Sequence, residues 1–157
     1  MKINIVLLEP QIPQNTGNIA RTCVITNSVL HIIGPIPFSL DEKNVKRAGL
    51  DYWGLLDLKY YESYEEFVEK NPNINIYYAT TKAKLNHSDV IYPKEDIFIM
   101  FGKETAGIPV NILEKNKDKC IRIPMLNIEK ARSLNLSNSV AIGVYEVLRQ
   151  WDYPGMK

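Results

Sequence analysis

Three stretches of this 157-residue sequence combine polar and glycine residues in patterns that could bind a ligand. Each follows a short apolar run: Thr80-Thr81-Lys82, the segment from Gly102 to Pro109, and the long segment from Pro124 to Ser133. In a parallel α/β sheet the carboxyl ends of the strands share one edge, and ligands bind outside that edge. We therefore expect the three loops to form one pocket.

The glycine spacing in the second loop is that of a phosphate-binding loop, but its sequence is not. Gly102 and Gly107 are five residues apart, and Ile108-Pro109 stand where a Walker A loop needs Lys and Ser or Thr. The sequence also lacks a G-x-G-x-x-G motif, which argues against ordinary dinucleotide binding. Two interpretations remain: a loop whose backbone wraps a purine or ribose, or a turn with Pro109 in the first turn of a helix.

Arg21 and Asn15 lie six residues apart around an expected helix start. With Asn15 or Thr16 as the N-cap, the free N–H groups of the helix would favour a nearby anion. If Asn15 precedes the helix, Asn15 and Arg21 could reach one site. The alternative is a capping asparagine and a surface arginine.

Two further polar features lie in these loops. Glu104 stands between the two glycines, where it could bind a ligand or position a basic side chain, or be a solvated loop charge. The segment from Ser133 to Ser139, which includes Asn135, has more hydroxyl and amide groups than one helix cap needs. The surplus indicates either ligand contacts or close packing by small residues.

Metal and disulfide chemistry are not indicated. His31 lies in an apolar run and His87 in a polar one, and neither has a ligand at metal-binding spacing. Two lone cysteines, Cys23 and Cys120, are typical of a reducing compartment. The apolar run at 3–8 is too short for a signal peptide or a membrane span. We expect a soluble, cytoplasmic protein with no membrane partner.

Composition is that of an ordinary globular protein, since 45% of residues are apolar and 24% are charged. The net charge is +1, which by itself attracts neither nucleic acid nor membrane. We expect one domain spanning residues 1–157.

The alternation of elements predicts an α/β fold with a mostly parallel sheet and helices on both faces. Residues 135–151 should form the last helix, because apolar residues recur there at three- and four-residue steps. Strands are expected at 3–8, 29–33, 55–61, 74–79, 97–101 and 120–123, and further helices at 19–25, 42–48 and 64–70.

Three motifs in combination resemble those of the SPOUT 2′-O-methyltransferases. They are NTGNIAR at 15–21, FGKETAGIP at 101–109, and IRIPM at 121–125 with RSLNLSN at 132–138. Shorter matches at 4–7, 9–10, 31–33, 47–52 and 153–155 extend the resemblance over nearly the whole chain. They are similar to the minimal branch, which methylates the ribose of the tRNA wobble nucleotide 34, a cytidine or modified uridine.

The resemblance implies a C-terminal trefoil knot that binds S-adenosylmethionine without a metal. It implies a homodimer through the last helix, with Arg21 of one chain beside the cofactor of the other. By position, the cofactor-binding residues would be Ala79, Thr80, Gly102, Gly107, Ile123, Met125, Ser133 and Leu134.

The resemblance implies that Arg21, activated by an RNA phosphate, takes the proton of the 2′-hydroxyl. A guanidinium holds its own proton too strongly to act as a base, so our hypothesis is that Arg21 instead clamps the phosphate and the 2′-oxygen, which lowers the pKa of the hydroxyl. Asn15, Glu104, Ser133 and Asn135 would orient the arginine and the ribose. The alternatives are methylation of another tRNA or rRNA position, and a non-catalytic RNA-binding or flavodoxin-like nucleotide-binding module.

The sequence departs from the family pattern at the edge of the expected site. Ala106 replaces a common basic residue, Lys103 stands where some relatives have proline, and the loop at 127–130 is longer. These departures affect RNA contacts more than cofactor binding. Candidate phosphate contacts are Lys43, Lys46, Arg47, Lys82, Lys84 and Lys130.

Overall fold

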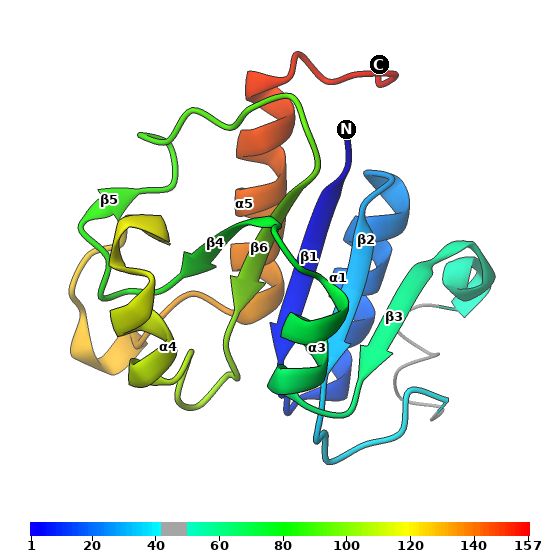
Figure 1. Cartoon of the computed structure of the whole chain (residues 1–157), viewed down its shortest axis with the longest axis horizontal. Coiled ribbons are helices and arrows are strands. Elements are labelled where there is room, and N and C mark those ends of the chain that lie inside the picture. The colour runs from blue at the N-terminus through cyan, green and yellow to red at the C-terminus, as the bar shows by residue number, and fades with distance from the viewer. Residues whose placement is uncertain (42–49) are drawn as a thin grey trace.

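Seven parallel strands form one sheet in the computed structural model, which describes residues 1–41 and 50–157 (Figure 1). The strand order is β3-β2-β1-β6-β4-β7-β5. The strands are β1 (Ile3–Leu8), β2 (Val29–Ile33), β3 (Asp57–Tyr61), β4 (Asn75–Ala79), β5 (Leu85–Asn86), β6 (Ile97–Phe101) and β7 (Cys120–Arg122). The helices are α1 (Pro13–Ile25), α3 (Tyr64–Lys70), α4 (Val110–Lys115) and α5 (Leu136–Gln150), with short 3-10 turns η1 (Leu50–Leu55), η2 (Lys117–Lys119) and η3 (Glu129–Ala131).

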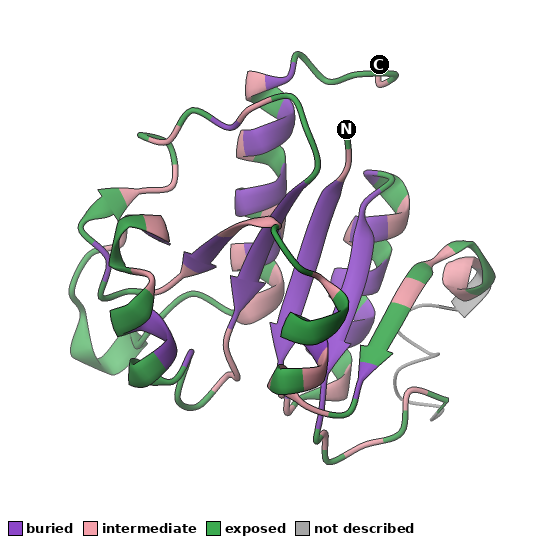
Figure 2. Cartoon of the chain, viewed as in Figure 1, coloured by how far each residue is buried: buried purple, intermediate pink, exposed green. Residues whose placement is uncertain are grey.

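Helices cover both faces of the sheet, as predicted. In β6, Ile97 and Ile99 face a core shared with α1 and α5, whereas Phe98 and Met100 face a second core shared with α3 and α4. This alternation follows from the two-residue period of a strand. The central strands are buried on both faces, as Figure 2 shows, and this is why their residues are apolar with the exception of Asn4 in β1.

The apolar stripe of α5 faces the first core. Val140, Val144, Val147 and Trp151 are buried there against α1 and the sheet. Gly143 lies on the same face, and a Cβ there would meet the Phe101 ring at 3.5 Å. The predicted last helix is therefore confirmed, although its first turn begins at Leu136.

One expected helix start is wrong, and the structure contains a strand that the sequence did not indicate. Helix α1 begins at Pro13 with Ile12 as its N-cap, so Asn15 and Thr16 lie inside the helix and do not cap it. Pro13 fixes the backbone angle of the first turn in advance, which accounts for the earlier start. The region 80–96 also contains a strand, β5, which has only two residues and no periodicity to reveal it.

The helix expected at 64–70 is confirmed as α3. The side chain of Ser63 caps α3 by accepting a hydrogen bond from the Glu66 N–H, at 3.1 Å. The helix expected at 42–48 lies outside the described residues. No helix in the described ranges has the length and apolar character that a bilayer crossing requires.

His31 is a buried polar residue in the middle of β2. Its Nε2 lies 2.8 Å from Asn4 Oδ1, and its Nδ1 lies 2.9 Å from the Tyr61 hydroxyl. The amide NH₂ of Asn4 donates to the Ile97 carbonyl, so Asn4 Oδ1 is left to accept a hydrogen bond from the Nε2–H of His31. Burial, with a smaller contribution from the Lys59 charge, lowers the pKa of His31 from 6.5 to about 4.

This burial predicts acid sensitivity. The unfolded chain takes up a proton near pH 6.5, but the folded one only near pH 4, so the stability is full above pH 6.5 and falls as the pH drops through this window. Between pH 7 and pH 5 the loss attributable to His31 is about 2 kcal/mol. Urea unfolding at the two pH values should show it, and the His31→Gln variant should have a pH dependence smaller by that amount. An equal pH dependence in both proteins would contradict the assignment.

Candidate functional site

The three loops expected to form one pocket do so. A pocket of about 830 Å³ lies beyond the carboxyl ends of β4, β6 and β7, which are neighbours in the sheet. Its lining includes every predicted cofactor-binding residue: Ala79, Thr80, Gly102, Gly107, Ile123, Met125, Ser133 and Leu134. Three of the four predicted catalytic residues, Asn15, Glu104 and Asn135, also line it.

The loop after β6 is a closed turn that depends on glycine at both ends. The Gly107 N–H donates to the Lys103 carbonyl at 2.9 Å, and Gly107 has a φ of +70°. The loop then folds back over Gly102, where a Cβ would lie 2.0 Å from the carbonyl carbon of Gly107 and 2.2 Å from the Ile108 nitrogen. Only glycine fits at 102, and glycine is favoured at 107 by its backbone angle.

A chain of hydrogen bonds joins the three motifs at this pocket. The Glu104 carboxylate accepts from the backbone N–H groups of Gln11, at 2.8 Å, and Ile12, at 2.9 Å. The Asn15 side-chain amide also donates to Glu104, at 3.1 Å, and the Asn135 amide donates to Asn15 Oδ1 at 3.0 Å. Glu104 thus holds the start of α1, and Asn15 connects it to the start of α5.

Asn135 has two tasks at the start of α5. Its Oδ1 accepts from the Ser137 N–H at 2.8 Å, which makes it the N-cap, while its amide points to Asn15. Ser133 and Ser139 line the pocket instead. The surplus of polar residues there therefore serves both the cap and the pocket wall.

Replacing Glu104 by Gln should lower the free energy of unfolding by about 1–3 kcal/mol. The amide keeps one acceptor, and its NH₂ group would face donors from Gln11, Ile12 or Asn15. Urea unfolding measures the loss, and Glu69→Gln on the exposed side of α3 removes the same charge as a control. If both variants are equally stable, the Glu104 bonds contribute no net stability.

Arg21 does not line this pocket. It is exposed on α1, whereas Asn15 is buried, so the two side chains occupy different faces of the helix. The Arg21 guanidinium carbon lies 5.2 Å from the centre of the Tyr52 ring in η1. The Tyr52 hydroxyl donates to the Gly17 carbonyl at 3.3 Å, so the ring is attached to the same helix.

Several pocket residues were missed because they resemble core residues in the sequence. Phe101, Ile108 and Leu113 are buried, and Leu136 is half-buried, so they form an apolar floor. Tyr52 was also missed as a partner of Arg21, although it belongs to the family-like segment 47–52.

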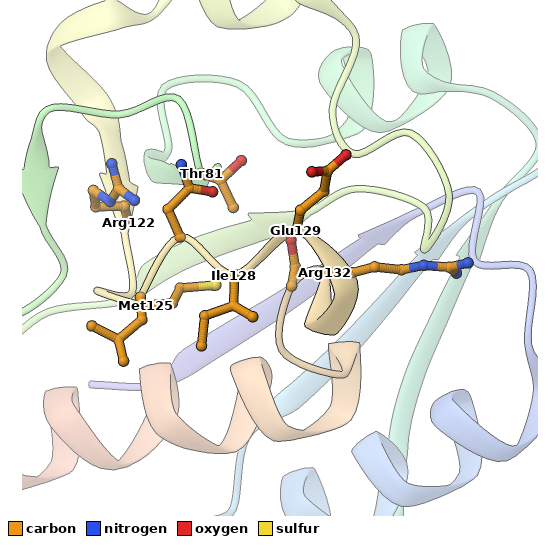
Figure 3. A pocket seen from close by; sticks show the side chains of 9 residues that line it. Thr81, Arg122, Met125, Ile128, Glu129 and Arg132 are labelled. Carbon is orange, nitrogen blue, oxygen red and sulfur yellow. The ribbon is translucent and has the colours of Figure 1, made fainter.

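A second pocket of about 560 Å³ adjoins the first (Figure 3). It lies between β7 and the loop that contains η3. Its charged lining residues are Arg122, Glu129 and Arg132, and Arg132 lines the first pocket as well.

The remaining candidates are placed as follows. Lys82 lines the larger pocket, and Lys84 and Lys130 are exposed. Lys43, Lys46 and Arg47 lie outside the described residues. Lys103 forms an ion pair with Glu9, at 3.6 Å between Nζ and Oε1. Within residues 1–41 and 50–157 there is no cluster of three or more His, Cys, Asp or Glu side chains that could hold a metal ion.

The chain is similar to known RNA methyltransferases along its length. It matches the SpoU rRNA Methylase family over residues 2–145. An Escherichia coli (strain K12) protein named tRNA (cytidine(34)-2'-O)-methyltransferase is 46% identical, over 98% of this chain and 96% of its own. A solved structure described as giving insight into the 2-OH methylation of C/U34 on tRNA has a TM-score of 0.90 and 34% identity, over 96% of this chain and 97% of the other. The SpoU methyltransferase AviRb of Streptomyces viridochromogenes, in complex with AdoMet, has the same fold at 21% identity (TM-score 0.83; 96% of this chain, 61% of the other).

Proposed function

The chain belongs to the SpoU methylase family, and we propose that it transfers a methyl group from S-adenosylmethionine to the ribose 2′-oxygen of tRNA nucleotide 34, a cytidine or modified uridine. The observation that carries this proposal is the pocket in which the loops after β4, β6 and β7 meet Asn15, Glu104 and Asn135. The Escherichia coli relative supports the choice of nucleotide, because the identity extends over nearly both chains.

The pocket suits a ligand with an apolar ring and several polar groups. At about 830 Å³ it falls in the size range of small-molecule sites. Its floor of Phe101, Ile108 and Leu136 suits an adenine face, and the hydroxyls of Thr80 and Ser133 lie along its polar wall. AdoMet in the related AviRb complex supports the same class of ligand.

In this proposal the loop backbones hold the cofactor. Ala79, Gly102 and Ile123 stand at or just beyond the ends of their strands, so their peptide groups are available to the ligand. Thr80, Gly107, Met125, Ser133 and Leu134 complete the wall. When bound, S-adenosylmethionine supplies a methyl group that is already electrophilic on its sulfonium sulfur.

The residues of the chain must then align the ribose, and the proton of its 2′-hydroxyl must pass to water as the oxygen takes the methyl group. Alignment of reacting atoms accounts for a large share of the rate in such transfers. Arg21 would contact the RNA phosphate and the 2′-oxygen, and its charge would stabilise the oxyanion as it forms. The hydrogen bonds that join Glu104, Asn15 and Asn135 hold the loop after β6 and the start of α5 in fixed positions relative to α1.

This role for Arg21 requires a second copy of the chain. Within one chain, Arg21 and the pocket are on different sides of α1. We propose a homodimer through α5, in which Arg21 of one copy completes the pocket of the other. The exposed apolar side chains of Ile142 and Tyr145 on α5 support it, because a dimer would bury them.

We further propose that residues 1–157 act as one cytoplasmic domain whose pocket loops form a trefoil knot. The strand order supports the knot. The chain leaves β6, passes β4 on the α4 side to reach β7, and returns on the opposite face as α5.

The test is transfer of labelled methyl from S-adenosylmethionine to bulk tRNA that lacks this modification, followed by nuclease mapping. We expect label on the 2′-oxygen of nucleotide 34. Label at another nucleotide would support the proposed reaction but identify a different target nucleotide. Cofactor binding without any labelled tRNA or rRNA would contradict the proposed function.

A further inference from the structure

The smaller pocket has no role in the function proposed above, yet it is continuous with the larger one. Thr81, Met125, Arg132 and Ser133 line both pockets. A ligand in the smaller pocket would therefore lie beside the cofactor. We propose that this pocket binds the single-stranded RNA next to nucleotide 34, with Arg122 and Arg132 each contacting a backbone phosphate. This inference rests on the proposed function.

The charges of the pocket support an anionic ligand. In the part of the chain that the structure describes, the Arg122 and Arg132 guanidinium groups make no ion pair and no side-chain hydrogen bond. By contrast, Arg149 is paired with Glu146. The one carboxylate in the lining, that of Glu129, has no ion-pair partner among these residues either. Two arginines without carboxylate partners are available to bind phosphate.

The directions of the two side chains indicate two separate phosphates. In Figure 3, Arg122 and Arg132 stand at opposite sides of the pocket, the Arg132 side chain extends away from Arg122, and Glu129 lies between them. This arrangement cannot clamp one small anion from both sides. It suits a strand that crosses the pocket and presents successive phosphates.

Apolar residues in the same loop provide a surface for a base. The side chain of Leu126 is 81% exposed and that of Ile128 is 51% exposed, and both line the pocket. Because Leu126 and Ile128 lie in one pocket beside two arginines, a ligand bound there would cover both. Unstacked bases of an RNA loop have flat faces that pack on apolar side chains.

The backbone at Arg132 is held in an uncommon conformation. Its φ is +60° and its ψ is −137°, a region that non-glycine residues rarely adopt. The N–H groups of Ala131 and Arg132 both donate to the Ile128 carbonyl, at 3.0 and 3.2 Å, so the η3 turn holds Arg132 in place. Such strain is concentrated at binding sites, and here it sets the position of Arg132 between the two pockets.

The decisive experiment measures binding of an anticodon stem–loop RNA to the full chain at several salt concentrations. Arg122→Gln is the main variant, because Arg122 lines only the smaller pocket. We expect about 5–10-fold weaker binding, and a salt dependence of log K reduced by about 0.7, the value for one phosphate contact on a single strand. Affinity for S-adenosylmethionine should not change.

Three further variants sharpen the test. Arg132→Gln should weaken RNA binding in the same way, and Glu129→Gln should strengthen it because it removes a negative charge. Lys117→Gln removes one positive charge before the opposite end of β7 and should leave both binding constants unchanged.

The inference is overturned if Arg122→Gln binds the RNA with the affinity and salt dependence of the parent chain. It is also overturned if Lys117→Gln has an equal effect, since the loss would then reflect net charge alone. Neither result affects the methylation assay of the parent chain at nucleotide 34. That assay tests the proposed function separately.

Discussion

Replacing Arg21 by Lys should lower kcat for tRNA methylation by about 100–1000-fold, the range measured when one stabiliser of a developing oxyanion is lost. Lysine keeps the charge, but it cannot contact phosphate and 2′-oxygen through one planar group or stack on the Tyr52 ring in the same way. Arg21 is not among the residues proposed to hold the cofactor, and lysine keeps the positive charge beside the partner's pocket, so the affinity for S-adenosylmethionine should stay the same. Single-turnover methylation and calorimetry measure the two quantities.

The matched control is Arg149→Lys, an exposed arginine paired with Glu146, which should keep full activity. Mixed dimers give a sharper test of the second copy. In a dimer of Arg21→Ala with Gly102→Ala, one site carries both defects and the other carries neither. Random mixing should therefore restore about a quarter of the wild-type sites. If the mixed dimers restore no activity, Arg21 acts in the site of its own chain. If Arg21→Lys keeps full activity, the proposed contact of Arg21 with both phosphate and 2′-oxygen is contradicted.

Gly102→Ala should abolish or severely weaken cofactor binding. The new Cβ would overlap the backbone of Gly107 and Ile108, and backbone cannot move aside as a flexible side chain can. Overpacking of this kind costs about 1–3 kcal/mol, which corresponds to a loss of about 5–150-fold in affinity if the loop adapts. Calorimetry with S-adenosylmethionine measures the affinity, and urea unfolding measures the stability.

Two other glycines serve as controls for Gly102→Ala. A Cβ at Gly54 would meet nothing within 4 Å, so Gly54→Ala should bind the cofactor normally. Gly107 also has open space but a φ of +70°, so Gly107→Ala should have an intermediate effect that comes from the backbone angle alone. Equal affinities for all three variants would show that the closed turn is not needed for binding.

The core strands were predictable because nearly all consecutive residues in each of them are apolar. Ile3–Leu8, Val29–Ile33 and Ile97–Phe101 are apolar except for Asn4 and His31, and each is a strand buried on both faces. The pocket was predictable for a related reason. Once the strands are parallel, the loops after β4, β6 and β7 must leave from the same edge.

Nearby residues gave only one signal for the start of α1, Pro13 in its first turn, and the other support comes from a distant residue. The N–H groups of Gln11 and Ile12 are bound by Glu104, which lies more than ninety positions away. Local capping rules consider only the residues beside the helix, so they favoured Asn15 and Thr16. In the structure Asn15 is instead the link between Glu104 and Asn135.

The position of Arg21 shows a different limit. Spacing along a helix can say that Asn15 and Arg21 occupy different faces, and the structure agrees. It cannot say what stands opposite an exposed arginine in an assembly. Only the family motif, which places Arg21 with the other two segments, indicates a shared site.

The strand order also has a consequence for how the protein is made. Strand β1 pairs with β6, although Ile3 and its partner Ile97 are more than ninety residues apart, and α5 follows every described strand in the chain. Before α5 is made, the sheet face that it covers, including Ile99 and Phe101, is only partly covered by α1. Nascent chains with an exposed apolar face of this kind are prone to aggregate. The pocket therefore stays incomplete until α5 has been synthesised and has packed on the sheet.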